Sequence, residues 1–267
     1  MRIAFLILLF IVGTCFGSFL CCQARRLRLK ETKQKSLGSR SVCLSCGYKL
    51  RWYDNIPILS WIFLRGKCRK CHKKIGLTEI LSELGVGLAF LSIGTTIDLT
   101  ASYSLFSILS IIFLFLLVLT LSFLAIYDGT YGELPSLFLI MSLILAVLTV
   151  VFNEWGINPG FDNLLERIFP ILSSVAILGG LYLVLYLVSK GKWVGDGDWI
   201  LGVILGIVLG NPWLALITLF LANILACLIM FPYVKKSRNK KIYFGPFLII
   251  AFIITLTFAN FFQSMIK

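Results

Sequence analysis

Charged side chains are scarce in this chain of 267 residues: only 14% are Asp, Glu, Lys or Arg, and 59% are hydrophobic. Soluble globular domains contain roughly 25% charged and 45–50% apolar residues, so this composition excludes an ordinary soluble domain. The alternation of polar and apolar residues that marks the strands of a membrane β-barrel is also missing. These deficits predict an all-α polytopic membrane protein with one short polar insert, residues 23–76.

Acidic residues and histidine are rarer still. Twelve Asp and Glu stand against 25 Lys and Arg, the net charge is +13, and His72 is the single histidine. Fifteen of the basic residues lie between Arg25 and Lys74, and others cluster at 190–192 and 235–241. Cytoplasmic loops of membrane proteins carry such an excess, so these clusters predict the cytoplasmic side. Because they flank apolar segments, we expect them to contact membrane lipid and not nucleic acid.

Eight apolar segments predict about eight transmembrane helices: residues 3–22, 78–97, 103–127, 134–152, 168–189, 199–210, 213–234 and 244–262. The sixth is short of the ~20 residues that span a bilayer. Asn211-Pro212 separates it from the seventh, and fusing the two would give seven spans. For the first segment, a cleaved signal peptide is an alternative. Its Gly13 and Gly17, four residues apart, predict close helix packing.

We therefore divide the chain into three parts: residues 1–22 as the first transmembrane helix, residues 23–76 as a cytoplasmic loop domain, and residues 77–267 as a transmembrane core. We expect the N-terminus to lie outside the cytoplasm. With eight spans, this orientation places every basic cluster in the cytoplasm.

Four cysteines in the polar insert are spaced as they are in metal-binding sites. Cys43 and Cys46 form one C-x2-C pair, and Cys68 and Cys71 form a second. Two such pairs supply four thiolates to a tetrahedral Zn²⁺, and a full set of protein ligands leaves no open position, which makes the zinc structural. A redox pair or free thiols are the alternatives. We expect His72 to be exposed and not a ligand.

Two aspartates lie at the ends of apolar segments, where a carboxylate is costly unless it is paired, solvated or used. Asp128 follows one such segment, and Asp198 opens another within Gly195-Asp196-Gly197-Asp198. The predicted topology places both at one membrane face. Two neighbouring carboxylates that share a proton can activate water, which indicates aspartyl proteolysis. An ordinary Gly-Asp turn is the alternative, and Asp196 is expected to be solvated in the loop.

The chain resembles the type IV prepilin leader peptidases, a family of GxGD intramembrane aspartyl proteases, nearly from end to end. The resemblance rests on an ordered set of motifs: Gly17-Ser18-Phe19-Leu20, the two cysteine pairs bracketing Asn55-Ile56-Pro57, Glu79, Tyr127-Asp128 with Leu134-Pro135, Gly195 to Asp198, and Phe244-Gly245-Pro246-Phe247. Cys21 and Ser136 stand where the family usually has Asn and Asp.

The resemblance implies a peptidase of the bacterial inner (plasma) membrane that removes a basic leader from prepilin-like precursors at the cytoplasmic face. It implies Asp128 and Asp198 as the catalytic pair and zinc on the four cysteines. It also implies S-adenosylmethionine, because many members then methylate the new N-terminus. Glu79, Gly195 and Gly197 are candidate supporting residues.

Glu133 stands beside the first motif, and we expect it to help dock the basic leader. Two other functions remain open at this point. A signal-peptide-peptidase-like protease would share Tyr127-Asp128, but the cysteine loop and the lack of a late Pro-Ala-Leu motif argue against it. A transporter could instead use the two aspartates as an ion site.

Overall fold

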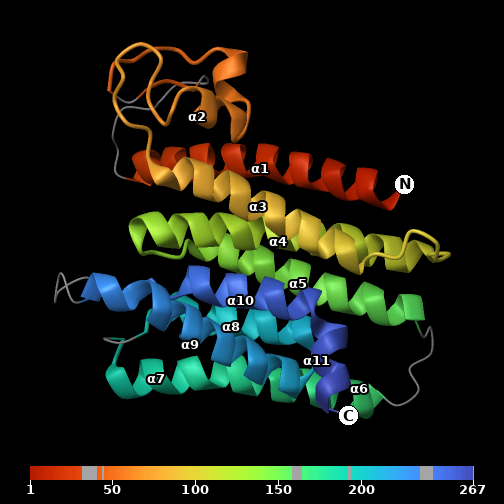
Figure 1. Ribbon diagram of the computed structural model, residues 1–267. Helices are drawn as coiled ribbons and strands as arrows, with labels where there is room; N and C mark the ends of the chain where they lie inside the picture. The colour runs from red at the N-terminus through yellow and green to blue at the C-terminus, as the bar shows by residue number, and fades with distance from the viewer. Residues whose placement is uncertain (32–40, 44, 158–163, 192–193, 235–242, 267) are drawn as a thin grey trace. The chain divides into compact units, whose positions relative to one another are not determined.

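The computed structural model describes residues 1–267 apart from 32–40, 44, 158–163, 192–193, 235–242 and 267. Lys192, the basic cluster at 235–241 and part of the loop at 154–167 therefore lie outside the described residues. Helices dominate the rest (Figure 1): α1 (Arg2–Glu31), η1 (Trp52–Asn55), α2 (Leu59–Phe63), α3 (Leu77–Thr96), α4 (Leu105–Tyr131), α5 (Ser136–Ile157), α6 (Leu164–Val175), the π-helix η2 (Ala176–Gly180), α7 (Leu181–Ser189), α8 (Asp196–Leu209), α9 (Pro212–Val234), α10 (Gly245–Thr257) and α11 (Ala259–Ile266).

Every predicted apolar segment is helical, and the all-α polytopic fold is confirmed. Among the described residues, six helical segments are long and apolar enough to cross a membrane, or seven if α10 and α11, bent by 72°, form one span. The segment missing from that count is α8, which has 14 residues. It stays separate from α9 because Gly210 adopts a φ of +56° and Pro212 begins the next helix. Fusion of the sixth and seventh segments is therefore wrong.

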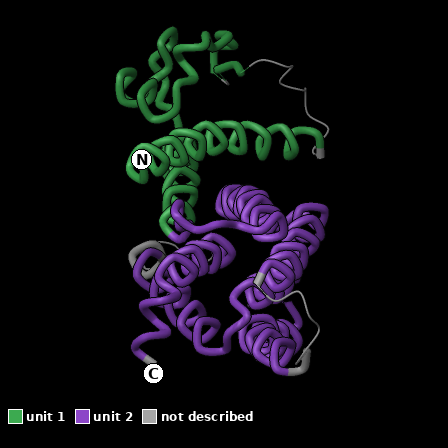
Figure 2. Tube along the Cα trace, turned by 90° about the vertical axis from the view of Figure 1, so that its right-hand side faces the viewer, with its two compact units in different colours: residues 1–95 green, residues 96–267 purple. Residues whose placement is uncertain are grey.

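The chain divides into two compact units, Met1–Thr95 and Thr96–Lys267 (Figure 2). The first contains the cysteine pairs, and the second contains both aspartates. The predicted division at residues 22 and 76 stays a prediction, although α1 continues beyond residue 22 to Glu31.

In the first unit, glycines bring α1 and α3 into backbone contact. A Cβ on Gly13 would lie 2.8 Å from the carbonyl oxygen of Val86, and one on Gly17 would lie 2.5 Å from that of Ser82. Gly87 is equally close to side chains of α1. Without room for a methyl group at these positions, the helices meet at the small-residue faces that membrane helices favour. The predicted close packing at Gly13 and Gly17 is confirmed.

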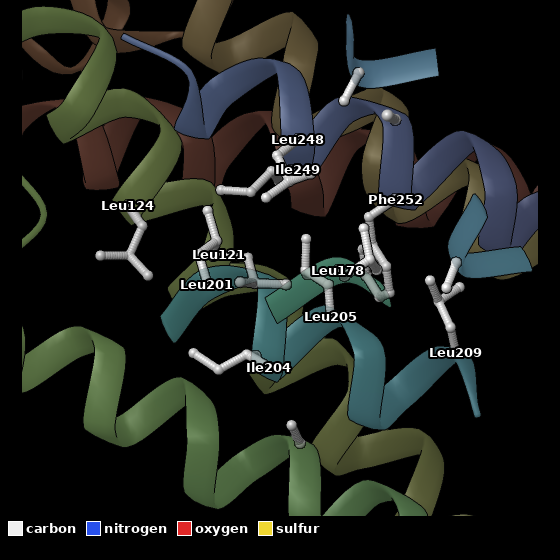
Figure 3. Close-up of a cluster of buried hydrophobic side chains, with 14 of the residues drawn as sticks. Leu121, Leu124, Leu178, Leu201, Ile204, Leu205, Leu209, Leu248, Ile249 and Phe252 are labelled. Atoms are coloured by element: carbon white, nitrogen blue, oxygen red, sulfur yellow. The ribbon is translucent and has the colours of Figure 1, made fainter. Parts of the chain in front are cut away.

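In the second unit, α4, η2, α8 and α10 surround one apolar core. Side chains from all four converge in Figure 3, where the labelled residues are Leu121, Leu124, Leu178, Leu201, Ile204, Leu205, Leu209, Leu248, Ile249 and Phe252. Gly202 and Gly206 let α8 approach the preceding helix: Cβ atoms there would lie 2.7 Å from the Leu178 oxygen and 2.8 Å from the Val175 Cα. The short α8 is thereby enclosed by its neighbours.

Candidate active site and metal centre

Asp128 lies one turn before the end of α4, where Gly132 closes the helix with a φ of +72° and donates to the Asp128 carbonyl. The Asp128 side chain is buried, at 6% exposure. Its Oδ2 accepts a hydrogen bond of 3.1 Å from the backbone N–H of Gly245, 117 residues away. A Cβ on Gly245 would stand 2.7 Å from this oxygen, so glycine is needed for the contact.

Asp198 is the third residue of α8 and is also buried, at 8% exposure. Its Oδ2 accepts a 3.0 Å hydrogen bond from the backbone N–H of Gly195, the residue before the helix. The free N–H groups of a first helical turn favour a carboxylate at this position. Asp196 begins the same helix, so its expected place in the loop is wrong, but it is exposed as expected.

The two aspartates converge because the helices that carry them share one core. Residues three or four apart lie on the same helix face. Leu124 on α4, Leu201 on α8 and Leu248 on α10 each lie about one turn from Asp128, Asp198 and Gly245, respectively. All three leucines are fully buried in the same cluster (Figure 3). Asp198 also acts electrostatically on Asp128. Two buried carboxylates within each other's field cannot both ionise easily, which is the arrangement of an acid–base pair.

The candidate supporting residues have unequal roles in the structure. Gly197 is buried, and a Cβ there would lie 2.7 Å from the Leu134 side chain. The glycine therefore lets the segment that joins α4 to α5 pack closely against the start of α8. Gly195 supplies the N–H that holds Asp198. Glu133 is exposed in the α4–α5 connection. A role for any of them in substrate binding stays a prediction.

The four cysteines of the first unit form one cluster from two matching turns. Their sulfur atoms all lie within 4.8 Å of one another, with 3.9 Å between Cys43 and Cys71 and 4.0 Å between Cys46 and Cys68. Tetrahedral Zn–S bonds of about 2.3 Å place sulfurs about 3.8 Å apart, so the cluster fits zinc. Disulfides are excluded at these separations.

The two turns have the same backbone plan. Val42 pairs with Lys49 across the first turn, and Lys67 pairs with Lys74 across the second. The residue after the second cysteine has positive φ in both: +67° at Gly47 and +55° at His72. His72 therefore has a corner position and is not in the ligand cluster.

The backbone of the first turn also prepares a thiolate. The N–H of Ser45 is the main cause that lowers the pKa of Cys43 to about 6. A thiolate is the form that binds metal. Desolvation and the neighbouring thiols raise the pKa of Cys46, in the same turn, to about 11, so the spacing of the four sulfurs, and not the acidity of one thiol, favours a metal site here.

The loop is anchored by acids that the sequence analysis missed. Asp54, whose side chain is fully buried, accepts from Arg69 Nε at 2.8 Å and from the Arg51 N–H at 3.1 Å. Burial acts to raise the pKa of Asp54, but these bonds hold it below the ordinary value. Glu83 of α3 is buried and accepts from the Ile58 N–H at 2.7 Å.

Glu79 lies one turn before Glu83 and pairs with Arg25 of α1. The sequence signal for Glu83 was an acidic residue inside an apolar segment, the same signal that identified Asp128.

A cavity of about 280 Å³ lies in this unit beneath the cysteine loop. Its walls include carboxylates, guanidinium groups and an indole ring, contributed by Glu79, Glu83, Arg25, Arg69 and Trp61. Acidic and basic side chains thus line the same cavity, where Glu79 pairs with Arg25 and Arg69 pairs with Asp54.

The fold and these sites define the class: a polytopic helical membrane protein with two buried aspartates and a loop whose four cysteines have the geometry of metal ligands. Residues 11–97 match the family model described as the bacterial peptidase A24 N-terminal domain. A protein of Vibrio cholerae serotype O1 named prepilin leader peptidase/N-methyltransferase is 30% identical over 267 residues, covering 95% of this chain and 97% of that protein. The chain belongs to the prepilin leader peptidase/N-methyltransferase family.

Other relatives carry the same name. The protein of Pseudomonas putida is 32% identical over 79% of this chain and 69% of its own length. The protein of Myxococcus xanthus is 40% identical, but the match covers 39% of this chain and 32% of that relative. No solved structure matches the chain.

Proposed function

We propose that this chain is an aspartic endopeptidase that removes the basic leader from type IV prepilin-like precursors, with Asp128 and Asp198 as the catalytic pair. One observation carries the proposal: two buried carboxylates, each held by a backbone N–H, converge on one core from helices far apart in sequence. The name shared by the relatives supports prepilins as the substrate class.

The chemistry follows from a pair that shares one proton. The ionised carboxylate takes a proton from water, and the water oxygen attacks the carbonyl carbon of the scissile peptide bond. The protonated carboxyl gives its proton to the carbonyl oxygen, which forms a neutral tetrahedral diol. The diol then collapses: one of its hydroxyl protons returns to a carboxylate, the other carboxyl protonates the leaving nitrogen, and the C–N bond breaks.

The active site is proposed to face the cytoplasm. Both aspartates lie where α4 ends and α8 begins, at the helix ends joined by the α4–α5 and α7–α8 connections. Glu133 and Asp196 are exposed at these same connections and offer negative charge to a basic leader. Reversal of Glu133 to Lys should therefore raise KM and leave kcat almost unchanged.

The decisive experiment uses purified protein in lipid vesicles with a pilin precursor. Asp128→Asn and Asp198→Asn should each abolish cleavage, while both variants accumulate in the membrane and retain helical content. Asp196→Asn is the matched control for the chemical step, because this exposed acid is in the same helical turn as Asp198: its kcat should match the wild type, with any change confined to KM. Near-normal cleavage by either of the first two variants would refute the catalytic pair.

N-methylation of the new N-terminus is the second proposed activity, because the relatives' shared name includes it. We take the cavity of the first unit as the binding site for S-adenosylmethionine, because carboxylate and guanidinium groups line it; the ligand's charged groups would exchange with the internal pair of Glu79 and Arg25. When bound, S-adenosylmethionine supplies an electrophilic methyl group. Glu79→Gln should weaken its binding, as measured by calorimetry, and leave leader cleavage intact.

A further inference from the structure

Tyr182 is a buried residue next to the aspartate pair that the proposed chemistry does not yet use. It is the second residue of α7, and only 4% of it is exposed. Its hydroxyl is buried and forms no hydrogen bond with the described residues. A buried hydroxyl normally has a partner, so one without needs an explanation.

Helix register places Tyr182 opposite Asp198. Gly206 of α8 meets Val175, and one turn closer to the start of α8, Gly202 meets Leu178 and Gly179. The two helices are antiparallel here, so the next turn along α8 reaches Asp198, and the next turn along its neighbour reaches Tyr182. Asp198 also acts electrostatically on the Tyr182 hydroxyl.

The ring of Tyr182 also touches the element that holds the other aspartate. It packs against Phe244, with 5.3 Å between ring centroids. The next residue, Gly245, donates its N–H to Asp128. Tyr182 thus packs against the residue next to the glycine that binds Asp128, and the helix register places it opposite Asp198. The π-helix η2 ends just two residues earlier, and such helical irregularities are frequent at functional sites.

We propose that the Tyr182 hydroxyl donates a hydrogen bond to the carbonyl oxygen of the scissile peptide bond and strengthens that bond as the tetrahedral intermediate forms. This inference rests on the proposed function. A carbonyl oxygen has two lone pairs, so it can accept from Tyr182 and from the protonated aspartate together. The hydroxyl has no partner among the described residues, and the substrate would supply one. A donor held in place before the reaction is the usual form of such stabilisation.

Tyr182→Phe tests the proposal because it removes one oxygen atom and keeps the ring against Phe244. We expect kcat for leader cleavage to fall about 100-fold, with KM nearly unchanged. The thermal midpoint should stay the same or rise, because no internal hydrogen bond is lost. Tyr186→Phe, one turn along α7 and half-buried, is the matched control and should cleave normally.

Two further measurements separate substrate contact from a positioning role. The pH dependence of kcat should keep its shape in Tyr182→Phe. A peptide with a hydroxyethylene group in place of the scissile amide should bind more weakly by a similar factor, whereas an uncleaved ground-state peptide should bind as before.

Three outcomes in Tyr182→Phe would overturn the inference. They are a kcat within twofold of the wild type, a shifted pH profile, which would mean that Tyr182 acts on the ionisation of Asp198 and not on the substrate, and unchanged affinity for the hydroxyethylene peptide. None of these outcomes bears on the proposed catalytic roles of Asp128 and Asp198, which would be refuted only if the Asp128→Asn or Asp198→Asn variant cleaves the precursor.

Discussion

The side chains of the cysteine loop and those of the aspartate pair are brought together in different ways. Cys43 and Cys71 are only 28 residues apart and lie on two turns of the same backbone plan. Asp128 and the Gly245 N–H that holds it are 117 residues apart and meet through packing of long helices. Local turn geometry builds the first site, and a shared apolar core builds the second.

The difference follows from composition. The loop has few aliphatic residues to form a core of its own, so we expect a metal ion held by the four cysteines to stabilise it instead. The second unit has abundant leucine and isoleucine on α4, α8 and α10, and their burial fixes helix positions. Replacing one of the four cysteines should therefore unfold the loop alone. Small steric changes at the helix contacts of the second unit should displace the aspartates without unfolding that unit.

Loss of the metal should have the largest effect. Structural zinc contributes about 10–16 kcal/mol to folding in small zinc-dependent domains. Cys68→Ser should abolish the bound zinc, measured by mass spectrometry of the metal, and should expose the loop to proteases. Cys227→Ser, at an exposed position on α9, is the control and should keep the metal. Normal metal content in Cys68→Ser would contradict the four-cysteine site.

A methyl group at Gly245 should disable the active site with little effect on folding. The added Cβ would lie 2.7 Å from Asp128 Oδ2, so the carboxylate must move. Displacement of a reacting group by about 1 Å costs up to 100-fold in rate, which is the loss expected in kcat. Gly180→Ala is the matched helical control, because open space surrounds its Cβ position. Equal cleavage by the two variants would argue against the Gly245 contact.

Gly17→Ala should loosen the contact between α1 and α3. Its Cβ would press on the Ser82 carbonyl at 2.5 Å, and overpacking of this kind costs about 1–3 kcal/mol. Gly85→Ala, on an open face of α3, should instead be neutral. The measurement is the thermal midpoint of unfolding in detergent, and a shift shared by both variants would contradict the packing argument.

Asp54→Asn should produce the most local effect, about 1–3 kcal/mol confined to the loop. The folded-state pKa of Asp54 lies below its unfolded value of about 3.9, so the carboxylate stabilises the loop above that pH. The advantage of the wild type over Asp54→Asn should be complete near neutrality and should disappear as the pH falls below about 4. Protease resistance of the metal-loaded loop measures it, and a pH-independent difference would exclude a role for the charge.

Several features could be predicted from residue patterns because local chemistry dictates them. The spacing of Cys43, Cys46, Cys68 and Cys71 predicted their cluster, and apolar runs predicted the long helices, though not η1 and α2 of the loop. Glu79 was chosen over Glu83, although the structure shows Glu83 holding the loop, because the burial of each acid depends on which face of α3 meets α1. Tyr182 and the Gly245 N–H carried no sequence signal, since their partners come from other helices.

By itself, the sequence determined the class of fold, the two paired-cysteine turns and two acids at the ends of apolar segments, because hydrophobicity, turn chemistry and cysteine spacing act over a few residues. Only the tertiary structure decided that Gly202 and Gly206 bring α8 against its neighbour, and that Gly245 reaches Asp128. These contacts depend on how helix faces fit together, and that fit is a property of pairs of surfaces distant in the chain.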